Sequence, residues 1–270
     1  MYISLTILTI ILYLICGGIL LLNLLNKLSS DSIGKQKLLS LAGVTVALHS
    51  FVLYSTLFTP TGIDIGFFNV LSIVAWLVSL LLTFAALSMA VECLGVLVYP
   101  FAALFLSTSL LSNESHLLPY TLSAGLLFHV MISILAYSLL SIAAVQAILL
   151  YVQDKQLHNK HPGGIIRSFP PLETMETLLF QVIIIGFIML GVSLFSGIVY
   201  LEDIFAQHLV HKTTLSIIAW ILFGILLLGR WRYGWRGKTA IRWTISGFVF
   251  LMLSYFGSKF VIELILHRSA

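Results

Sequence analysis

The residues of this chain whose types and positions could carry chemistry are its histidines. His49 and His129 each interrupt an apolar segment, and each lies roughly 12 Å along its helix from the end that we predict to face outward. His208 and His211 stand just before another apolar segment. Neutral imidazole is a good axial ligand for haem iron, and two imidazoles can hold the iron from opposite faces. The histidines are therefore candidate haem ligands near the outer face of a membrane, and their types and positions alone leave a structural role open.

Each of these histidines also has a purely structural explanation. A histidine inside a membrane helix can serve only as a hydrogen-bond partner for a neighbouring helix, and this could be the whole role of His49. His208 and His211 could simply be interfacial polar residues. The two cysteines, Cys16 and Cys93, form no CxxC pair and no CxxCH haem-attachment motif, so we expect structural thiols. Acidic residues are nearly absent from the apolar centres, which argues against a proton- or sodium-coupled transporter.

A polar stripe recurs every four residues along the segment that contains His129. Its members are His129, Ser133, Tyr137 and Ser141. Residues four apart lie on one face of a helix, and a polar face inside a bilayer should turn toward protein or a cavity. Ser193 and Gly197 form a small-xxx-small pair in the next segment, which favours close helix packing.

The elements that must position these residues are membrane-spanning helices. The chain is 60% hydrophobic and only 9% charged, whereas a soluble domain carries roughly 25% charged residues. A spanning helix needs about 20 apolar residues. The predicted spans are 2–25, 38–58, 67–89, 93–111, 121–152, 177–201, 211–228 and 240–266. We therefore predict an all-α polytopic bundle of about eight transmembrane helices, in a single membrane domain over residues 1–270.

The basic residues predict how these helices are oriented. Eleven of the 14 lie in alternate loops, and by the positive-inside rule they face the cytoplasm. These are Lys27, Lys35, Lys37, Lys155, Lys160, Arg167, Arg230, Arg232, Arg236, Lys238 and Arg242. The other side carries Lys212, Lys259 and Arg268. An even number of spans then places both termini on the periplasmic side. These positions assign the positive charge to topology, so we expect a lipid bilayer and no nucleic acid as a partner.

Three stretches of the chain resemble the cytochrome c assembly family, the CcsA/CcmC-like proteins. The first is Leu-Phe-His-Val at 127–130, and the second is Phe-Pro-Pro-Leu-Glu at 169–173. The third is Gly-Trp-Arg-Gly-Lys-Thr-Ala at 234–240, followed by Tyr-Phe-Gly at 255–257. The third stretch and the segment 206–212 look most like a YpjD-like inner-membrane branch of that family. The likeness covers residues 62–266.

The resemblance implies a haem-handling protein of the bacterial inner membrane in which His129 is an external axial ligand. Relatives that ligate haem to cytochrome c carry a tryptophan-rich loop, and this loop falls on residues 207–212, where only Lys212 matches. A membrane histidine of the family falls on Leu228, and the second external histidine falls one residue from His267. The likeness therefore predicts haem binding without ligase activity on its own, and no enzyme.

The sequence leaves three functions open. The first is a haem-binding factor in cytochrome c-type assembly, with His129 and His211 on the haem iron and His49 as the second choice for the partner ligand. The second is a non-enzymatic accessory or regulatory subunit of an inner-membrane divalent metal ion exporter. The third is a cytochrome b-like electron carrier that uses His49 and His129. The first two also imply other membrane assembly or transport proteins as partners.

Overall fold

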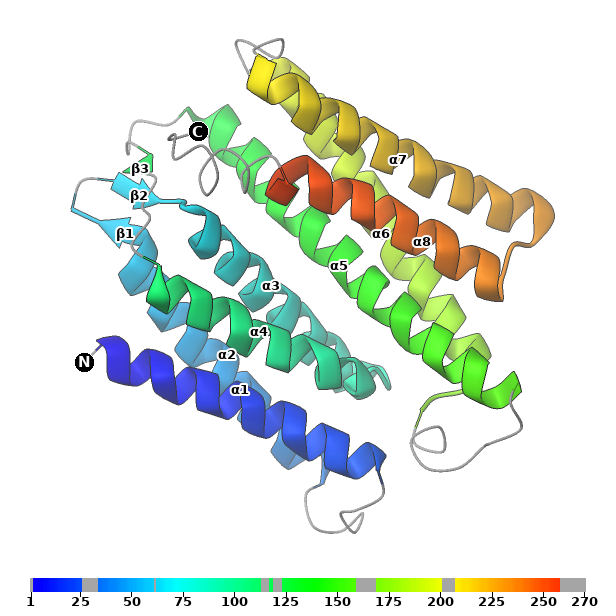
Figure 1. Cartoon of the computed structure of the whole chain (residues 1–270), viewed down its shortest axis with the longest axis horizontal. Coiled ribbons are helices and arrows are strands. Elements are labelled where there is room, and N and C mark those ends of the chain that lie inside the picture. Colours follow the sequence, from blue (N-terminus) through cyan, green and yellow to red (C-terminus); the bar gives the residue numbers. More distant parts are fainter. Residues whose placement is uncertain are drawn as a thin grey trace. The chain divides into compact units, whose positions relative to one another are not determined.

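The computed structural model describes residues 2–25, 34–60, 62–112, 117–118, 123–158, 169–200 and 207–257, and within these ranges eight helices are long and apolar enough to cross a membrane (Figure 1). The helices are α1 (Tyr2–Leu24), α2 (Lys35–Leu57), α3 (Phe67–Ser88), α4 (Gly95–Leu111), α5 (Ala124–His158), α6 (Leu172–Tyr200), α7 (Gln207–Tyr233) and α8 (Gly237–Met252). A 3-10 turn, η1 (Glu92–Leu94), precedes α4, and a π turn, η3 (Leu253–Gly257), follows α8. The prediction of an all-α protein with eight spans is confirmed. Lipid offers no hydrogen bonds to an exposed backbone, so apolar segments of this length fold as helices.

Two compact units divide the chain. Unit 1 comprises Met1–Leu118 and Gln153–Pro171, and unit 2 comprises Pro119–Val152 and Leu172–Ala270. The single-domain prediction stays a prediction. Helices α1 to α4 belong to unit 1, whereas most of α5 and all of α6 to α8 belong to unit 2.

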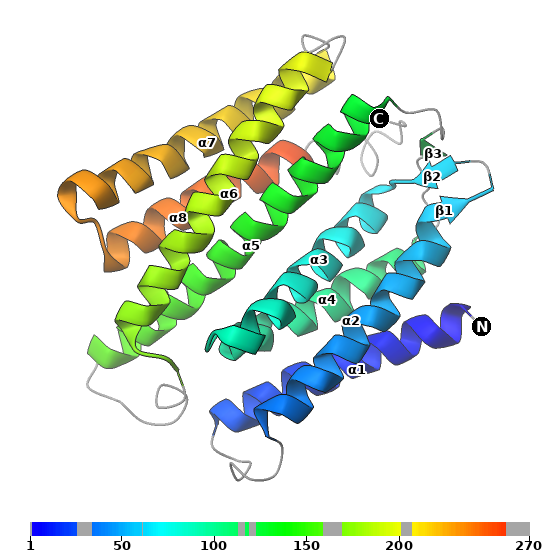
Figure 2. The ribbon, with the colours of Figure 1, turned by 180° about the vertical axis from the view of Figure 1, so that it is seen from behind.

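In unit 1 the four helices form a bundle in which α1 packs on α2 and α4, and α3 packs on the same two helices (Figures 1 and 2). The closest approach of α1 to α4 depends on Gly17, because a Cβ at this position would lie 2.9 Å from Cδ and Cγ of Pro100. Lys35 at the start of α2 forms an ion pair with Glu92 in η1. The same end of the bundle therefore carries the predicted cytoplasmic lysine and the short turn between α3 and α4.

A small antiparallel sheet lies in unit 1 where we expected only loops. It contains β1 (Phe58–Thr59), β2 (Gly62–Asp64) and β3 (Leu117–Leu118), in the order β1-β2-β3. Phe58 pairs with Ile63, which also pairs with Leu118. Strands of two or three residues are too short to show the alternating pattern by which strands are recognised in a sequence.

Some helices begin or end at other residues than predicted, because polar residues that we assigned to loops are part of the helix. Helix α6 begins at Leu172 rather than at 177, directly after two prolines, and proline is well suited to a helix start but not to its interior. The first turns of α6 therefore contain Glu173 and Glu176, which the predicted bounds assign to the loop.

Helices α7 and α8 meet at a tight turn in which Gly234 and Gly237 have φ of 66° and 53°, a region that glycine adopts without steric cost. The predicted continuation to residue 266 lies outside the described residues.

The orientation of the helices can be tested with reporter fusions. We expect fusions after Gln153 and after Gly237 to report the cytoplasm, and a fusion after Asp203 to report the periplasm, because eleven basic residues lie on the first side. Alkaline phosphatase and green fluorescent protein fusions give opposite readouts and control for expression. A periplasmic readout at either of the first two positions would contradict the predicted topology.

Candidate functional site

His129 lies in the second turn of α5 and contacts α6 within unit 2. Its Nδ1 is 3.1 Å from the carbonyl oxygen of Ser193 and 2.9 Å from Oγ of Ser196. The Ser196 hydroxyl donates to the same Ser193 carbonyl at 2.9 Å. One backbone carbonyl of α6 thus accepts from both side chains and fixes the orientation of the imidazole ring.

The directions of these hydrogen bonds determine where the proton of His129 lies. A carbonyl oxygen only accepts, so Nδ1 must carry the hydrogen when it bonds Ser193. The proton of Ser196 is already given to Ser193, so its Oγ accepts from Nδ1. In the neutral ring Nε2 then holds the free lone pair, and within the described ranges no group donates to it. The unprotonated nitrogen that a metal needs is therefore available.

Two further members of the predicted polar stripe, Ser133 and Tyr137, also face protein, whereas the Ser141 hydroxyl donates to the Tyr137 carbonyl within α5. Ser133 donates to the His129 carbonyl at 2.6 Å, so the Ser193 hydroxyl, 2.6 Å away, donates to Ser133 in turn. Tyr137 donates to Sδ of Met252 in α8, and its ring lies edge-on to Phe256, 5.1 Å between centroids. These contacts confirm that the stripe turns toward α6 and α8. Ser193, six percent exposed, makes the predicted close contact of α6 with α5.

His211, the predicted partner ligand, lies in the second turn of α7, and its side chain lies outside the described residues. The same holds for His208, while His267 falls wholly outside the described ranges. The predicted pair of His129 and His211 therefore stays a prediction.

His49 occupies a closed network in the centre of unit 1. Its Nδ1 is 3.0 Å from the Tyr13 hydroxyl of α1, and its Nε2 is 3.0 Å from Oγ of Ser72 in α3. All three side chains have no exposed surface. Both ring nitrogens are thus engaged, and an iron bond through either one would break a hydrogen bond in the bundle core. This geometry favours the hydrogen-bond interpretation of His49 over the ligand interpretation.

The stripe that sequence reasoning missed runs along α3. Its members, spaced alternately three and four residues apart, are Asn69, Ser72, Trp76, Ser79 and Thr83. Four of the five bond to α2 or α4: Asn69 accepts from Ser109, Ser72 meets His49, Trp76 donates to Ser50, and Thr83 meets the Tyr99 hydroxyl. The spacing was visible in the sequence, because residues three and four apart share a helix face. It marks the face of α3 that lies inside the four-helix bundle.

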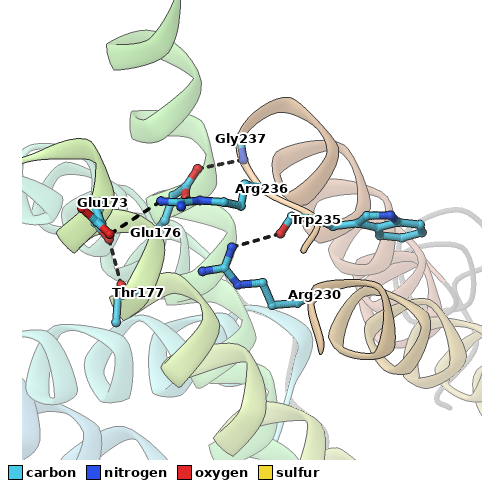
Figure 3. Close-up of polar contacts among 7 residues, drawn as sticks. All are labelled: Glu173, Glu176, Thr177, Arg230, Trp235, Arg236 and Gly237. Atoms are coloured by element: carbon cyan, nitrogen blue, oxygen red, sulfur yellow. Dashed lines mark hydrogen bonds and ion pairs between the residues drawn. The ribbon is translucent and has the colours of Figure 1, made fainter. Parts of the chain in front are cut away.

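A second cluster joins the two proline- and glycine-containing motifs at the start of α6 and the α7–α8 turn (Figure 3). The Glu176 carboxylate accepts from Nε of Arg236 at 2.9 Å and from the Gly237 N–H at 2.7 Å. Its side chain is four percent exposed, whereas that of Arg236 is 51 percent exposed. The hydrogen bond to Glu176 raises the pKa of Arg236 above its ordinary value. Because a carboxylate satisfies the free N–H at a helix start, Glu176 fixes where α8 begins.

Arg230 completes this cluster from the last turn of α7. Its Nη1 donates to the Trp235 carbonyl at 3.3 Å, and its guanidinium lies 4.8 Å from the ring centroid of Phe180 in α6. Sequence reasoning assigned Glu176 to a loop and so missed its role. The available signal was a glutamate shortly after two prolines, which is typical of the first turns of a helix.

The helix count and the family comparison identify the class of this protein. It is a multi-pass α-helical membrane protein, and residues 37–266 match the family model described as cytochrome C assembly protein. The chain belongs to the cytochrome c assembly protein family, which confirms the resemblance. No solved structure matches it.

Several relatives carry names of their own. The inner membrane protein YpjD of Escherichia coli K12 is 32% identical over 205 residues, which cover 76% of this chain and 78% of YpjD. A 28.8 kDa protein of Azospirillum brasilense is 32% identical over 140 residues, or 51% of this chain and 52% of the relative. The cytochrome c biogenesis protein CcsA of Guillardia theta is 27% identical over 191 residues, 62% of this chain and 64% of CcsA.

Replacing His49 by alanine should destabilise the protein. The substitution leaves the buried Tyr13 hydroxyl and Ser72 hydroxyl without their partner. Each unsatisfied buried group costs about 1–3 kcal/mol, so the loss of a partner for two groups should lower the free energy of unfolding by roughly 2–6 kcal/mol in total. Thermal unfolding of the purified protein in detergent measures the effect. His158→Ala, at an exposed position at the end of α5, is the control, and equal stability of the two variants would contradict the network.

Proposed function

We propose that this chain is a haem-binding factor of cytochrome c-type assembly in a bacterial inner membrane. Family membership supports the assembly role, and the names of the CcsA and YpjD relatives support the pathway and the membrane. The observation that carries haem binding is the hydrogen-bonding state of His129. Its Nδ1–H is bound by α6, and its Nε2 has no partner among the described residues.

The donor set at His129 fits haem iron. Histidine ligands of metals usually donate their other ring N–H to a backbone carbonyl or a carboxylate, which fixes the tautomer and raises the basicity of the ligating nitrogen. Ser193 supplies that carbonyl here, and Ser196 adds a hydroxyl acceptor. Bound haem would supply the iron porphyrin that cytochrome c assembly handles. The role of the chain is to hold and orient it through α5 and α6.

His211 is the partner ligand that we propose, because it lies at the start of α7 within the segment that takes the place of the haem-facing loop of the family. His49 is the second choice, and its closed network counts against it. We further propose that the chain is not an enzyme and does not attach haem covalently on its own, because the segment 206–211 lacks the aromatic residues and the aspartate of the ligase loop. The accessory-subunit and electron-carrier alternatives gain no specific support from the described contacts.

Replacing His129 by alanine should lower the haem content of the purified protein. Loss of even an outer partner of a metal ligand weakens metal binding about ten- to hundred-fold, so loss of the ligand itself should weaken haem binding by at least as much. The haem content per protein is measured by the pyridine haemochrome spectrum.

Two controls separate ligation from folding. His158→Ala removes an imidazole from the opposite end of the same helix and should keep the haem content of the original protein. Added imidazole should restore haem binding to His129→Gly, because it can occupy the space of the lost ring. Equal haem content in the original protein and His129→Ala would refute the assignment. A haem-free original protein would favour the accessory-subunit alternative.

The chain alone should not mature a reporter cytochrome c in cells stripped of other assembly factors. Covalent attachment requires haem to be presented to a CxxCH thiol pair, and the stacking surface of the ligase loop is missing from residues 206–211. Haem stain of the reporter on a denaturing gel measures attachment, with a complete assembly system as the positive control. A stained band that depends on this chain would restore the ligase interpretation.

A further inference from the structure

The turn between α7 and α8 gathers more positive charge than the protein neutralises. Five basic residues lie within 13 positions, namely Arg230, Arg232, Arg236, Lys238 and Arg242. Arg236 is bound to Glu176 and lies 4.0 Å from Glu173, and Arg230 is held over Phe180. The exposed side chains of Arg232, Lys238 and Arg242 have no ion pair with any described residue. Three cations of this turn are therefore without an acidic partner in the part of the chain that the structure describes.

Aromatic side chains place this turn at the depth of lipid headgroups. The rings of Tyr233, Trp235 and Trp243 form a stacked row, with centroid separations of 6.4 and 5.5 Å. Trp231 is 83% exposed and Tyr233 is 76% exposed. Tryptophan and tyrosine concentrate at the membrane–water interface, because their rings are apolar and their edges are polar. Arg232 and Arg242 directly precede Tyr233 and Trp243 of this aromatic row.

Specific contacts hold the backbone of the hairpin that carries these residues. The Glu176 carboxylate holds both Arg236 and the first N–H of α8 (Figure 3). The Trp235 ring packs so closely on Gly229 that a Cβ there would lie 2.2 Å from it. Lys238 and Arg242 are four residues apart on α8 and so share one face of the helix. Two cations on one helix face at headgroup depth suit a phosphate group, because both can attract the same anion.

We propose that the α7–α8 hairpin is a docking site for the phosphate headgroup of an anionic phospholipid, held by Arg232, Lys238 and Arg242. The choice of lipid over soluble phosphate follows from the aromatic row and exposed Trp231, which need an apolar neighbour as well as an anion. Basic clusters at the cytoplasmic end of membrane helices attract anionic lipids in this way. The site is independent of haem and of His129.

Native mass spectrometry of the purified full chain with equal phosphatidylglycerol and phosphatidylcholine tests the proposal. The triple variant R232Q/K238Q/R242Q should lose the preference for phosphatidylglycerol by about 100-fold, and K238Q alone by about five-fold. The charge-preserving variant R232K/R242K should retain it. K155Q removes an exposed lysine from the same predicted side of the membrane and should have no effect.

Each possible result of the lipid-binding experiment either supports or overturns the proposed lipid site. Equal retention of phosphatidylglycerol by K238Q and K155Q would overturn the proposal even if the triple variant fails to fold. Displacement of the lipid by millimolar inorganic phosphate would also overturn it, because the site would then recognise a soluble anion. A preference for phosphatidylglycerol that survives excess phosphate and falls with K238Q would establish the lipid site.

Discussion

A polar side chain inside a bilayer must find its hydrogen-bond partner within the protein, because no water is present to replace that partner. The polar clusters of the described helices follow that constraint, and three buried atoms depart from it: Oγ of Ser79, Oε1 of Gln153 and Nε1 of Trp220 have no hydrogen-bond partner among the described residues. The α3 stripe meets α2 and α4, the α5 stripe meets α6 and α8, and Glu176 meets the start of α8. Lipid tails are as apolar as an apolar helix face, so apolar contacts alone do little to select which helix faces pack together. The hydrogen bonds therefore specify which faces pack together.

The same constraint gives different chemistry to two similar histidines. His49 and His129 both interrupt apolar helices, and both bond to neighbouring helices. His49 uses both ring nitrogens for hydrogen bonds within the four-helix bundle, so neither nitrogen is left to bind a metal. His129 uses only Nδ1, because its two acceptors lie on the same side of the ring. The structural role of His49 and the ligand role that we propose for His129 thus differ by a single hydrogen bond.

The cluster around Glu176 shows how one buried acid organises a surface. Glu176 neutralises Arg236 and caps α8, whereas Arg232, Lys238 and Arg242 have no partner acid among the described residues. Two of the three stretches that carry the family resemblance, at 169–173 and 234–240, are brought together by this cluster. Their joint presence in the sequence therefore has a structural reason that does not depend on a ligand.

The sequence by itself determined the spans, because length and apolar composition suffice to place a helix in a bilayer. It also determined which residues were candidates, including His129 and its polar stripe. It could not determine the start of α6 or the role of Glu176, because the partners Arg236 and Gly237 lie 60 and 61 positions away. Nor could it separate His49 from His129. The free nitrogen of a histidine depends on which hydroxyls and carbonyls other helices bring to its ring, and only the tertiary structure decides that.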